Sequence, residues 1–382
     1  MEFSLSREQV ALRDNVQRYC REHYDSNKRR TLLHSATGFS MEHWTAFADL
    51  GWLGAALPEE VGGYGGSIVE MAVILEEFGR ALVLEPYLFS AVLSARAVCM
   101  AADHAQSRAV LEPMILGSSL LALAHRESDH PNGASSIATT AQRLANGGFT
   151  LQGAKRMVLG GNHAHRFIVS ARTSGELNDS DGVSLFLLEH TASGLSRRSY
   201  RTLDGRGAAD LHFNAVHLDE AALLGVEGAG FGAAECAIDW AIVGLCAEAL
   251  GSMDSVISTT LSHLKTRRTY GSLLSEYQSL QHRIADMLVE FEMSRSIFHF
   301  ALATFTSGDR EATRRAASSA KALIGRAGNF IAANGIQLHG ATGMLEDYVI
   351  GQQFKRLTVV EALFGNSDFH LSRRLQPLAQ PA

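Results

Sequence analysis

Apolar and polar positions divide the chain into two helical blocks that flank a block of short strands. In residues 1–117, Val10, Leu12 and Val16 recur near helical spacing behind Ser6, which with Gln9 can cap a helix. A second amphipathic stretch covers Val69 to Leu84. We expect its polar side to carry Glu70, Glu76 and Glu77.

The pattern of residue types changes between residues 118 and 225. Short runs rich in β-branched and apolar residues alternate there with Gly, Asn and Asp, which is typical of an antiparallel sheet. The runs are Phe149–Gln152, Phe167–Ser170, Val183–Leu188 and Asp210–Phe213. Long helical patterns return at 231–268, 275–307, 309–338 and 360–375. The sequence therefore predicts an α+β protein with an N-terminal helical domain (1–117), a middle β-domain (118–225) and a C-terminal helical domain (226–382).

Composition excludes several classes of function. The formal net charge of −6 is spread along 382 residues without a long basic run. The charge pattern therefore does not indicate binding to nucleic acid or to a membrane surface. Four widely separated cysteines in mostly apolar settings indicate reduced core residues in a cytoplasmic protein. The closest histidines, His163 with His165, and His299 in a Phe-rich helix, lack a carboxylate at ligand spacing, so we expect no metal site.

Glu248 is the first candidate for chemistry, because it is the only charge in the apolar stretch from Ala241 to Leu250. A carboxylate buried in such a helix either keeps a raised pKa, which suits a general base, or is neutralised by a cationic partner. The residue types alone leave both interpretations open.

Two further segments carry polar groups suited to a polyanion. Arg267-Arg-Thr-Tyr-Gly271 ends one helical pattern, and Gln278 lies near the start of the next. A guanidinium at such a turn can hold a pyrophosphate bidentately. Gln337-Leu-His-Gly340 ends another helical pattern, where exposed backbone could approach a second anionic group.

Taken together, these segments resemble the acyl-CoA dehydrogenase family over essentially the whole chain. The shared features are Leu57-Pro-Glu-Glu-Val-Gly-Gly, Gly228-Ala-Gly-Phe231, Arg267-x-x-Tyr-Gly271 with Gln278, Ala285-Asp-Met287 and Gln337-Leu-His-Gly340, in family order. More narrowly the chain is similar to the small subunit of pimeloyl-CoA dehydrogenase, with His125-x-Glu127 and Phe354-Lys-Arg-Leu-Thr358.

The resemblance implies a fold whose C-terminal domain is a four-helix bundle, FAD as cofactor, an acyl-CoA substrate and oxidation to a trans-2-enoyl-CoA. It also implies an electron-transfer flavoprotein as electron acceptor. The residues it places at FAD are Arg267, Tyr270, Gln278, Gln337, Leu338, His339 and Gly340. Asp239 keeps the family position near the CoA moiety.

The chain departs from the family where the flavin and the base are expected. Phe364 and Ala241 occupy the two family positions for the catalytic Glu, and neither can accept a proton. Met157 and Leu159 replace the Trp and the hydroxyl that face the flavin, and His125-Arg-Glu-Ser-Asp129 replaces another flavin-facing segment. Glu248 lies seven residues beyond Ala241, on the same helical face, and could act as the base instead.

The chain has thus kept the residues that the family donates across a subunit interface and lost those around its own flavin. We therefore expect a subunit of a heteromeric (α2β2) acyl-CoA dehydrogenase for a bulky or polar acyl-CoA, of the steroid side-chain or dicarboxylic type. The alternative is a non-catalytic partner that completes the FAD site of a catalytic subunit.

Overall fold

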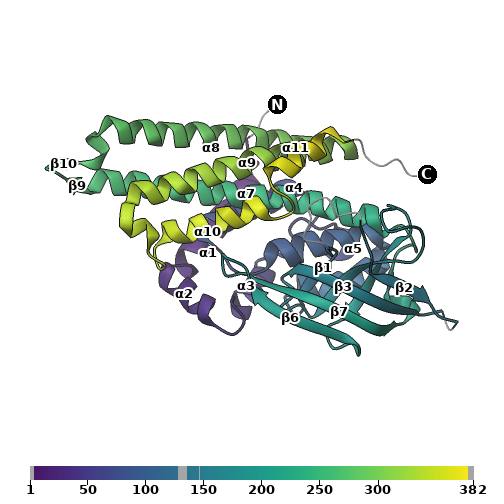
Figure 1. The fold of residues 1–382 in the computed structure, drawn as a ribbon. Coiled ribbons are helices and arrows are strands. Elements are labelled where there is room, and N and C mark those ends of the chain that lie inside the picture. The colour runs from purple at the N-terminus through teal and green to yellow at the C-terminus, as the bar shows by residue number, and fades with distance from the viewer. Residues whose placement is uncertain (1–3, 128–135, 146, 377–382) are drawn as a thin grey trace. The chain divides into compact units, whose positions relative to one another are not determined.

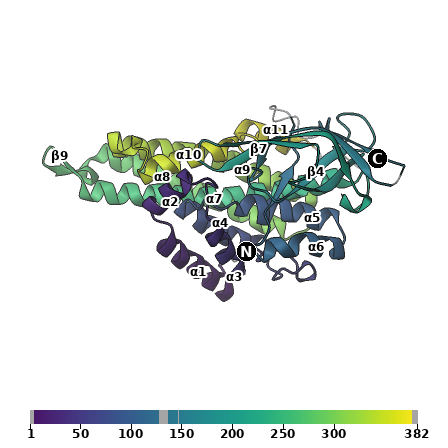
Figure 2. The same cartoon turned by 90° about the horizontal axis from the view of Figure 1, so that it is seen from below.

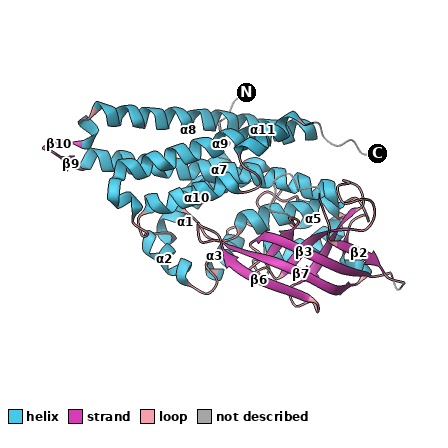
Figure 3. Ribbon diagram, in the orientation of Figure 1, coloured by secondary structure: helices cyan, strands magenta, loops and turns pink. Residues whose placement is uncertain are grey.

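The computed structural model describes residues 4–127, 136–145 and 147–376. These residues form two compact units that cut across the three predicted domains. The first unit contains the segment up to residue 36, residues 68–84 and the chain from 242 onward, and the second contains residues 37–67 and 85–241. The structure contains both the helical and the sheet elements of the predicted α+β class (Figure 3).

The first unit is built from helices. They are α1 (Arg7–His23), α2 (Ser26–His34), α4 (Ile68–Ala81), α8 (Gln278–Phe305), α9 (Arg310–His339), α10 (Val349–Ala362), α11 (Ser367–Leu375) and most of α7 (Gly230–Thr266). Helices α7, α8 and α9 run alongside one another (Figure 1). A short hairpin, β9 (Arg268–Thr269) and β10 (Ser272–Leu273), joins the ends of α7 and α8 at one tip of the bundle (Figure 2). The predicted cap on α1 is confirmed, because Ser6 and Gln9 form a reciprocal capping box.

Two details of the helical prediction are wrong. The last helix, expected at 360–375, is two helices, because the chain turns sharply at Phe364 (φ +58°) and Gly365 (φ +105°). The second error concerns Glu77 of α4, which is buried instead of facing solvent. Its carboxylate accepts a hydrogen bond from Arg80 Nε at 3.2 Å, which compensates the buried charge.

The second unit is organised around an eight-stranded sheet with the order β6-β7-β3-β2-β4-β5-β8, in which β1 also pairs with β4. The strands are β1 (Leu121–Ala124), β2 (Thr140–Arg143), β3 (Phe149–Leu159), β4 (Arg166–Arg172), β5 (Val183–Glu189), β6 (Leu195–Arg201), β7 (Gly207–Leu218) and β8 (Leu223–Leu224). All four predicted strand segments lie in observed strands. The sheet is mainly antiparallel, but β1 pairs in parallel with β4, and β2 does so at one residue pair. The parallel pairing of β1 with β4 is possible because the long connection between them contains β2 and β3.

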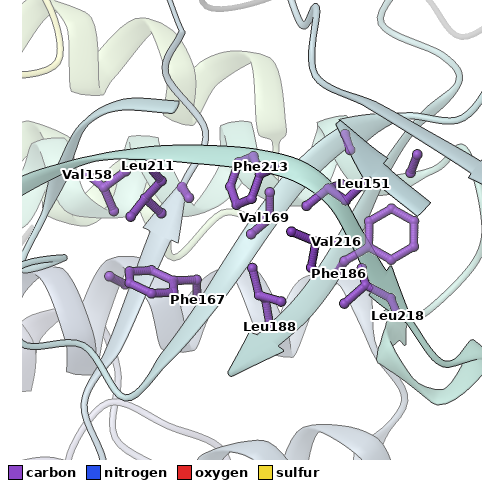
Figure 4. Packing of buried hydrophobic residues seen from close by; sticks show 14 of the residues in the cluster. Leu151, Val158, Phe167, Val169, Phe186, Leu188, Leu211, Phe213, Val216 and Leu218 are labelled. Carbon is purple, nitrogen blue, oxygen red and sulfur yellow. The ribbon is translucent and has the colours of Figure 1, made fainter. Parts of the chain in front are cut away.

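Aromatic and aliphatic side chains from alternate strand positions fill the core of this unit. Phe149, Phe167, Phe186 and Phe213 are at most 1% exposed and belong to one cluster (Figure 4). Helices α3 (Met41–Asp49), α5 (Ala95–Ala101) and α6 (His104–Ile115), and a π-helical segment, Leu88–Ser94, complete the unit. The π-helical segment packs on β1, where Ser90 Oγ accepts a hydrogen bond from Leu121 N at 2.9 Å.

Helix α7 is long and apolar enough to span a membrane by composition, but 83% of the relevant window is buried inside the structure. That burial is typical of the core helix of a folded domain. Two glycines bring α4 and α7 into backbone contact. A Cβ at Gly79 would lie 1.9 Å from the carbonyl oxygen of Glu248, and one at Gly251 would lie 1.7 Å from that of Glu76.

We predict that Gly79→Ala and Gly251→Ala each destabilise the protein, because a methyl group must push two helix backbones apart. Overpacking of this kind typically costs ~1–3 kcal/mol. Gly232, on the same helix α7, is the matched control, since nothing lies within 4 Å of its added Cβ. Gly232→Ala should be neutral or stabilise by up to ~1 kcal/mol. Thermal unfolding of the three variants measures the difference, and equal melting temperatures would contradict the close crossing.

Candidate functional site

A pocket of about 630 Å³ opens at the tip of the helical unit, where α7, α8 and α9 end or begin. Its walls come from four separate segments of the chain. They are His263, Arg267, Thr269, Leu274, Ser279, Leu280, Arg283, Gln337, Leu338, His339, Gly340, Ala341 and Thr342. The two motifs that sequence analysis had to treat separately therefore meet in one place.

The pocket is suited to an anion. Arg267 and Arg283 both line it, and within the described part of the chain no Asp or Glu is among its lining residues. The first turn of α8, at Ser279 and Leu280, contributes the positive end of a helix of 28 residues. Gly340 adopts φ +58° at the end of α9, a conformation that favours glycine. The arrangement can hold a phosphate or pyrophosphate by guanidinium and backbone N–H groups.

Two stacked histidines form one wall of this pocket. The rings of His263 and His339 lie 4.2 Å apart, and His339 Nδ1 is 3.2 Å from the hydroxyl of Tyr348. Burial, and then the neighbouring His263, lower the pKa of His339 to about 4. Burial and Arg267 also lower the pKa of His263. Both rings are therefore neutral near pH 7, and the buried Nε2 of His339 has no hydrogen-bond partner among the residues that the structure describes. A phosphate oxygen is a suitable acceptor for that position.

The structure brings together five of the seven predicted FAD residues. Tyr270 and Gln278 do not line the pocket: Tyr270 is 98% exposed at φ +53°, and Gln278 is exposed at the start of α8. Sequence analysis missed His263, Ser279 and Arg283. The available signal was the position of His263 four residues before Arg267, which directly follows α7, because that spacing places both on one side of the helix end.

The structure places Glu248 beside a cationic partner, which is the second of the two environments that the sequence left open. It is 1% exposed, and its two carboxylate oxygens accept hydrogen bonds from Arg356 Nε at 2.9 Å and Nη2 at 2.6 Å. Arg356, on α10, is also 1% exposed. The residue types could not reveal this partner, which is 108 positions away. The catalytic assignment of Glu248 is therefore corrected: a bidentate buried pair leaves the carboxylate no free access to a substrate proton.

Asp239 and Ala241 lie earlier on α7, in the second unit. Asp239 is 4% exposed and Ala241 is fully buried. The substrate-binding role of Asp239 stays a prediction. Ser128 and Asp129 of the segment that follows β1 lie outside the described residues. No group of three metal-ligating side chains occurs among the residues that the structure describes.

His125 and Glu127, which begin the segment that replaces a flavin-facing motif of the family, belong to a buried polar network. Lys155, which is fully buried, donates hydrogen bonds to Glu127 Oε1 at 2.5 Å, Ser170 Oγ at 3.0 Å and the His125 carbonyl at 3.1 Å. Burial lowers the pKa of Lys155 to about 8 despite the carboxylate beside it. Met157, two residues on, adopts φ +51° at an irregularity of β3. The network fixes the backbone of this segment.

The turn that carries Phe364 is also held by buried groups. Lys321 Nζ donates to the carbonyls of Glu361 at 3.0 Å and Gly365 at 2.8 Å. His370 Nε2 lies 3.1 Å from the Phe364 carbonyl, so this nitrogen carries the proton. Phe364 at positive φ is a strained position, and such strain persists only where surrounding contacts enforce it. The turn at Phe364 is therefore held rigidly, although the Phe364 side chain cannot accept a proton.

Comparison with known proteins identifies the class to which this fold and this pocket belong. Residues 6–118, 122–219 and 228–375 match the N-terminal, middle and C-terminal domains of acyl-CoA dehydrogenase. The chain therefore belongs to the acyl-CoA dehydrogenase family. Members of this family are FAD-dependent oxidoreductases that act on acyl-CoA, which confirms the predicted fold and cofactor.

Particular relatives extend over nearly the whole chain. An acryloyl-CoA reductase (NADH) from Anaerotignum propionicum is 26% identical over 375 residues, covering 97% of this chain and 94% of the relative. A variant of the Tcur3481-Tcur3483 steroid ACAD is 27% identical with a TM-score of 0.85, over 96% of both chains. The ChsE4-ChsE5 complex from Mycobacterium tuberculosis shares the fold at 22% identity, with a TM-score of 0.87 over 98% and 97% of the two chains.

The ion pair leads to a stability prediction for Glu248. Glu248→Gln should leave the buried guanidinium of Arg356 without a charged partner and lower the free energy of unfolding by ~3–5 kcal/mol. Replacing both partners, as in Glu248→Met with Arg356→Leu, should recover much of that loss because no unpaired charge remains. Denaturant unfolding of the wild type, Glu248→Met, Arg356→Leu and the double variant measures the coupling. A Glu248→Gln protein that keeps wild-type stability and loses all turnover would restore the catalytic assignment.

The turn leads to a prediction on pH. Burial lowers the pKa of His370 from 6.5 to about 3, so the unfolded state binds more protons than the folded state between these values. Stability from His370 is fully present above pH 6.5 and is lost as pH falls toward 3, by at most ~1.4 kcal/mol per pH unit. His370→Gln should flatten this part of the stability profile, whereas His282→Gln, at an exposed position on α8, should not. An unchanged slope in His370→Gln would contradict the assignment.

Proposed function

We propose that this chain is one subunit of a heteromeric FAD-dependent acyl-CoA dehydrogenase and that it supplies the tip pocket to a flavin shared with a second, related subunit. The observation that carries the proposal is the contrast between two parts of the chain. Arg267 lies in one cationic pocket with four other predicted FAD residues, whereas Met157 and Leu159 stand where the family places its flavin-facing Trp and hydroxyl. A chain that served only its own flavin would need both parts.

The pocket fits the diphosphate of FAD by its chemistry. Arg267 and Arg283 supply charge, the neutral His339 supplies one N–H, and the start of α8 supplies backbone donors. When bound, FAD accepts the hydride that leaves Cβ of the acyl-CoA. The residues of this chain would bind and orient the diphosphate.

The catalytic base comes from the partner subunit in this proposal. Ala241 and Phe364 cannot accept a proton, and Glu248 is held by Arg356. The rigid turn around Phe364 then serves the fold of this chain instead of its chemistry. An electron-transfer flavoprotein is the proposed acceptor of the electrons, and the cytoplasm remains the predicted location.

The substrate class that we propose is a bulky or polar acyl-CoA, with a steroid side-chain ester as the first candidate. The support is the similarity to the steroid ACAD, together with the small Ala241 in place of a carboxylate. The alternative function, a partner that completes the site without contacting the acyl group, is favoured by the same loss of a base. The two differ in whether substitutions in this chain change the acyl-chain preference of the assembled enzyme.

We predict that Arg267→Ala weakens FAD retention in the assembled enzyme by ~2–5 kcal/mol, because it removes a charged contact that bound FAD and the partner subunit would cover. Arg267→Lys should rescue the loss only partly, since an ammonium cannot reproduce the bidentate geometry. Arg268→Ala is the matched control: Arg268 is adjacent and exposed, its Nη1 donates to the Gly271 carbonyl at 3.2 Å, and it does not line the pocket.

The measurement is the flavin content per assembly after gel filtration, read with the melting temperature of each variant. Flavin loss in Arg267→Ala with an unchanged melting temperature of the apoprotein supports the proposal. Flavin content in Arg267→Ala equal to that of Arg268→Ala would show that the motif only ends a helix.

A further inference from the structure

The connection between α9 and α10 brings a tyrosine hydroxyl to a histidine in the wall of the tip pocket. Helix α9 ends at His339, and a short 3-10 turn, Gly340–Met344, leads toward Tyr348, the N-cap residue of α10. The Tyr348 hydroxyl lies 3.2 Å from His339 Nδ1, and within the described part of the chain it forms no other hydrogen bond. Tyr348 is not among the lining residues of the tip pocket, so it acts on that pocket through His339.

The contact with Tyr348 determines which nitrogen of His339 carries the proton. A neutral imidazole has one N–H donor and one bare nitrogen, and the hydrogen bond at one nitrogen sets the state of the other. Burial raises the pKa of Tyr348, so its phenol stays protonated near pH 7 and can donate. The phenol O–H then donates to Nδ1, which leaves the imidazole proton on Nε2.

Nε2 is the nitrogen of His339 that is left for a ligand. His339 lines the tip pocket and is 5% exposed, and its Nε2 has no hydrogen-bond partner among the described residues. A buried N–H without an acceptor is unfavourable, and an anionic oxygen would remove that cost. The ring of His263 stacks on the ring of His339 at 4.2 Å and limits its rotation.

The opposite tautomer would work against an anion. With its proton on Nδ1, His339 would present the lone pair of Nε2 to the phosphate oxygens, which repel it. Arg267 and Arg283 attract an anion whatever the state of the histidine, because their guanidinium groups are always charged. A neutral histidine contributes to an anion site in only one of its two forms, so it needs a neighbour that selects that form.

We propose that Tyr348 is a positioning residue for the FAD diphosphate: its hydroxyl donates to Nδ1 of His339 and thereby directs the Nε2–H of His339 toward a diphosphate oxygen. The inference rests on the proposed function, because it takes the tip pocket as the site of the diphosphate. Tyr348 itself does not touch the cofactor. Through this hydrogen bond, the start of α10 contributes to a pocket whose lining residues come from α7, α8, α9 and the turns beside them.

The first test observes the tautomer in the purified full chain. With 15N-labelled histidine, NMR correlations distinguish a protonated ring nitrogen from a bare one, and His339→Gln identifies the signals of His339. The wild-type chain should carry the proton on Nε2, and Tyr348→Phe should shift His339 toward a mixture of both tautomers. A wild-type proton on Nδ1, or the same tautomer in wild type and Tyr348→Phe, would overturn the proposal.

The second test measures FAD binding by the assembled enzyme. Tyr348→Phe should raise the dissociation constant of FAD ~3–10-fold, which is the scale of one hydrogen bond. Tyr277→Phe is the matched control, since the Tyr277 hydroxyl donates to the Thr269 carbonyl at 3.0 Å and does not contact His339. In the His339→Gln background, Tyr348→Phe should weaken FAD binding no further, because both residues act through one contact.

The Arg267→Ala variant separates this inference from the proposed function. Loss of FAD in Arg267→Ala together with wild-type affinity in Tyr348→Phe would sink the role of Tyr348 and leave the proposed function standing. Full FAD retention in both variants would show that the tip pocket does not hold the diphosphate, and both ideas would fail. Equal losses in Tyr348→Phe and Tyr277→Phe would contradict the inference, because a general loosening of the tip would then explain both.

Discussion

The crossing of α4, α7 and α10 is the constraint on which the helical unit depends. Gly79 and Gly251 bring α4 and α7 into backbone contact, and the Glu248–Arg356 pair ties α7 to α10 at the same level. Gln353 of α10 donates to the carbonyls of Gly79 and Arg80 at 3.3 Å. A buried ion pair contributes little net stability relative to an apolar pair, but its loss on one side is costly. Glu248 is therefore important for the fold. Its lone charge in an apolar helix had suggested a catalytic role from the sequence.

The same constraint determines where function can reside. Glu248 is paired with Arg356, and Phe364 and Ala241 cannot accept a proton, so none of these three positions offers an available base. The tip of the helical unit is different: two arginines, two neutral histidines and the first turn of α8 surround one pocket. The chain belongs to a family of FAD-dependent enzymes, and we propose that this pocket binds the diphosphate of that cofactor.

Much of the fold follows from local pattern. The capping box at Ser6, the strands of the middle block and the helices α7, α8 and α9 are specified by residues close together in sequence. The break between α10 and α11 was missed, because Phe364 at positive φ is enforced by Lys321 and His370, which belong to other helices. The family resemblance supplied five of the residues that line the tip pocket. Sequence analysis overlooked His263 despite its spacing to Arg267, and it could not supply Arg283, whose role depends on how the helices end in space, or the partner of Glu248, which is distant in sequence.

The central claim is that this chain completes a flavin site that it does not hold alone. The most direct measurement is the flavin content of the chain purified by itself and after assembly with a related, unlike acyl-CoA dehydrogenase subunit. The account predicts almost no flavin in the isolated chain and one flavin for each copy of this chain in the assembly. Stoichiometric FAD on the isolated chain, with turnover of an acyl-CoA, would contradict it.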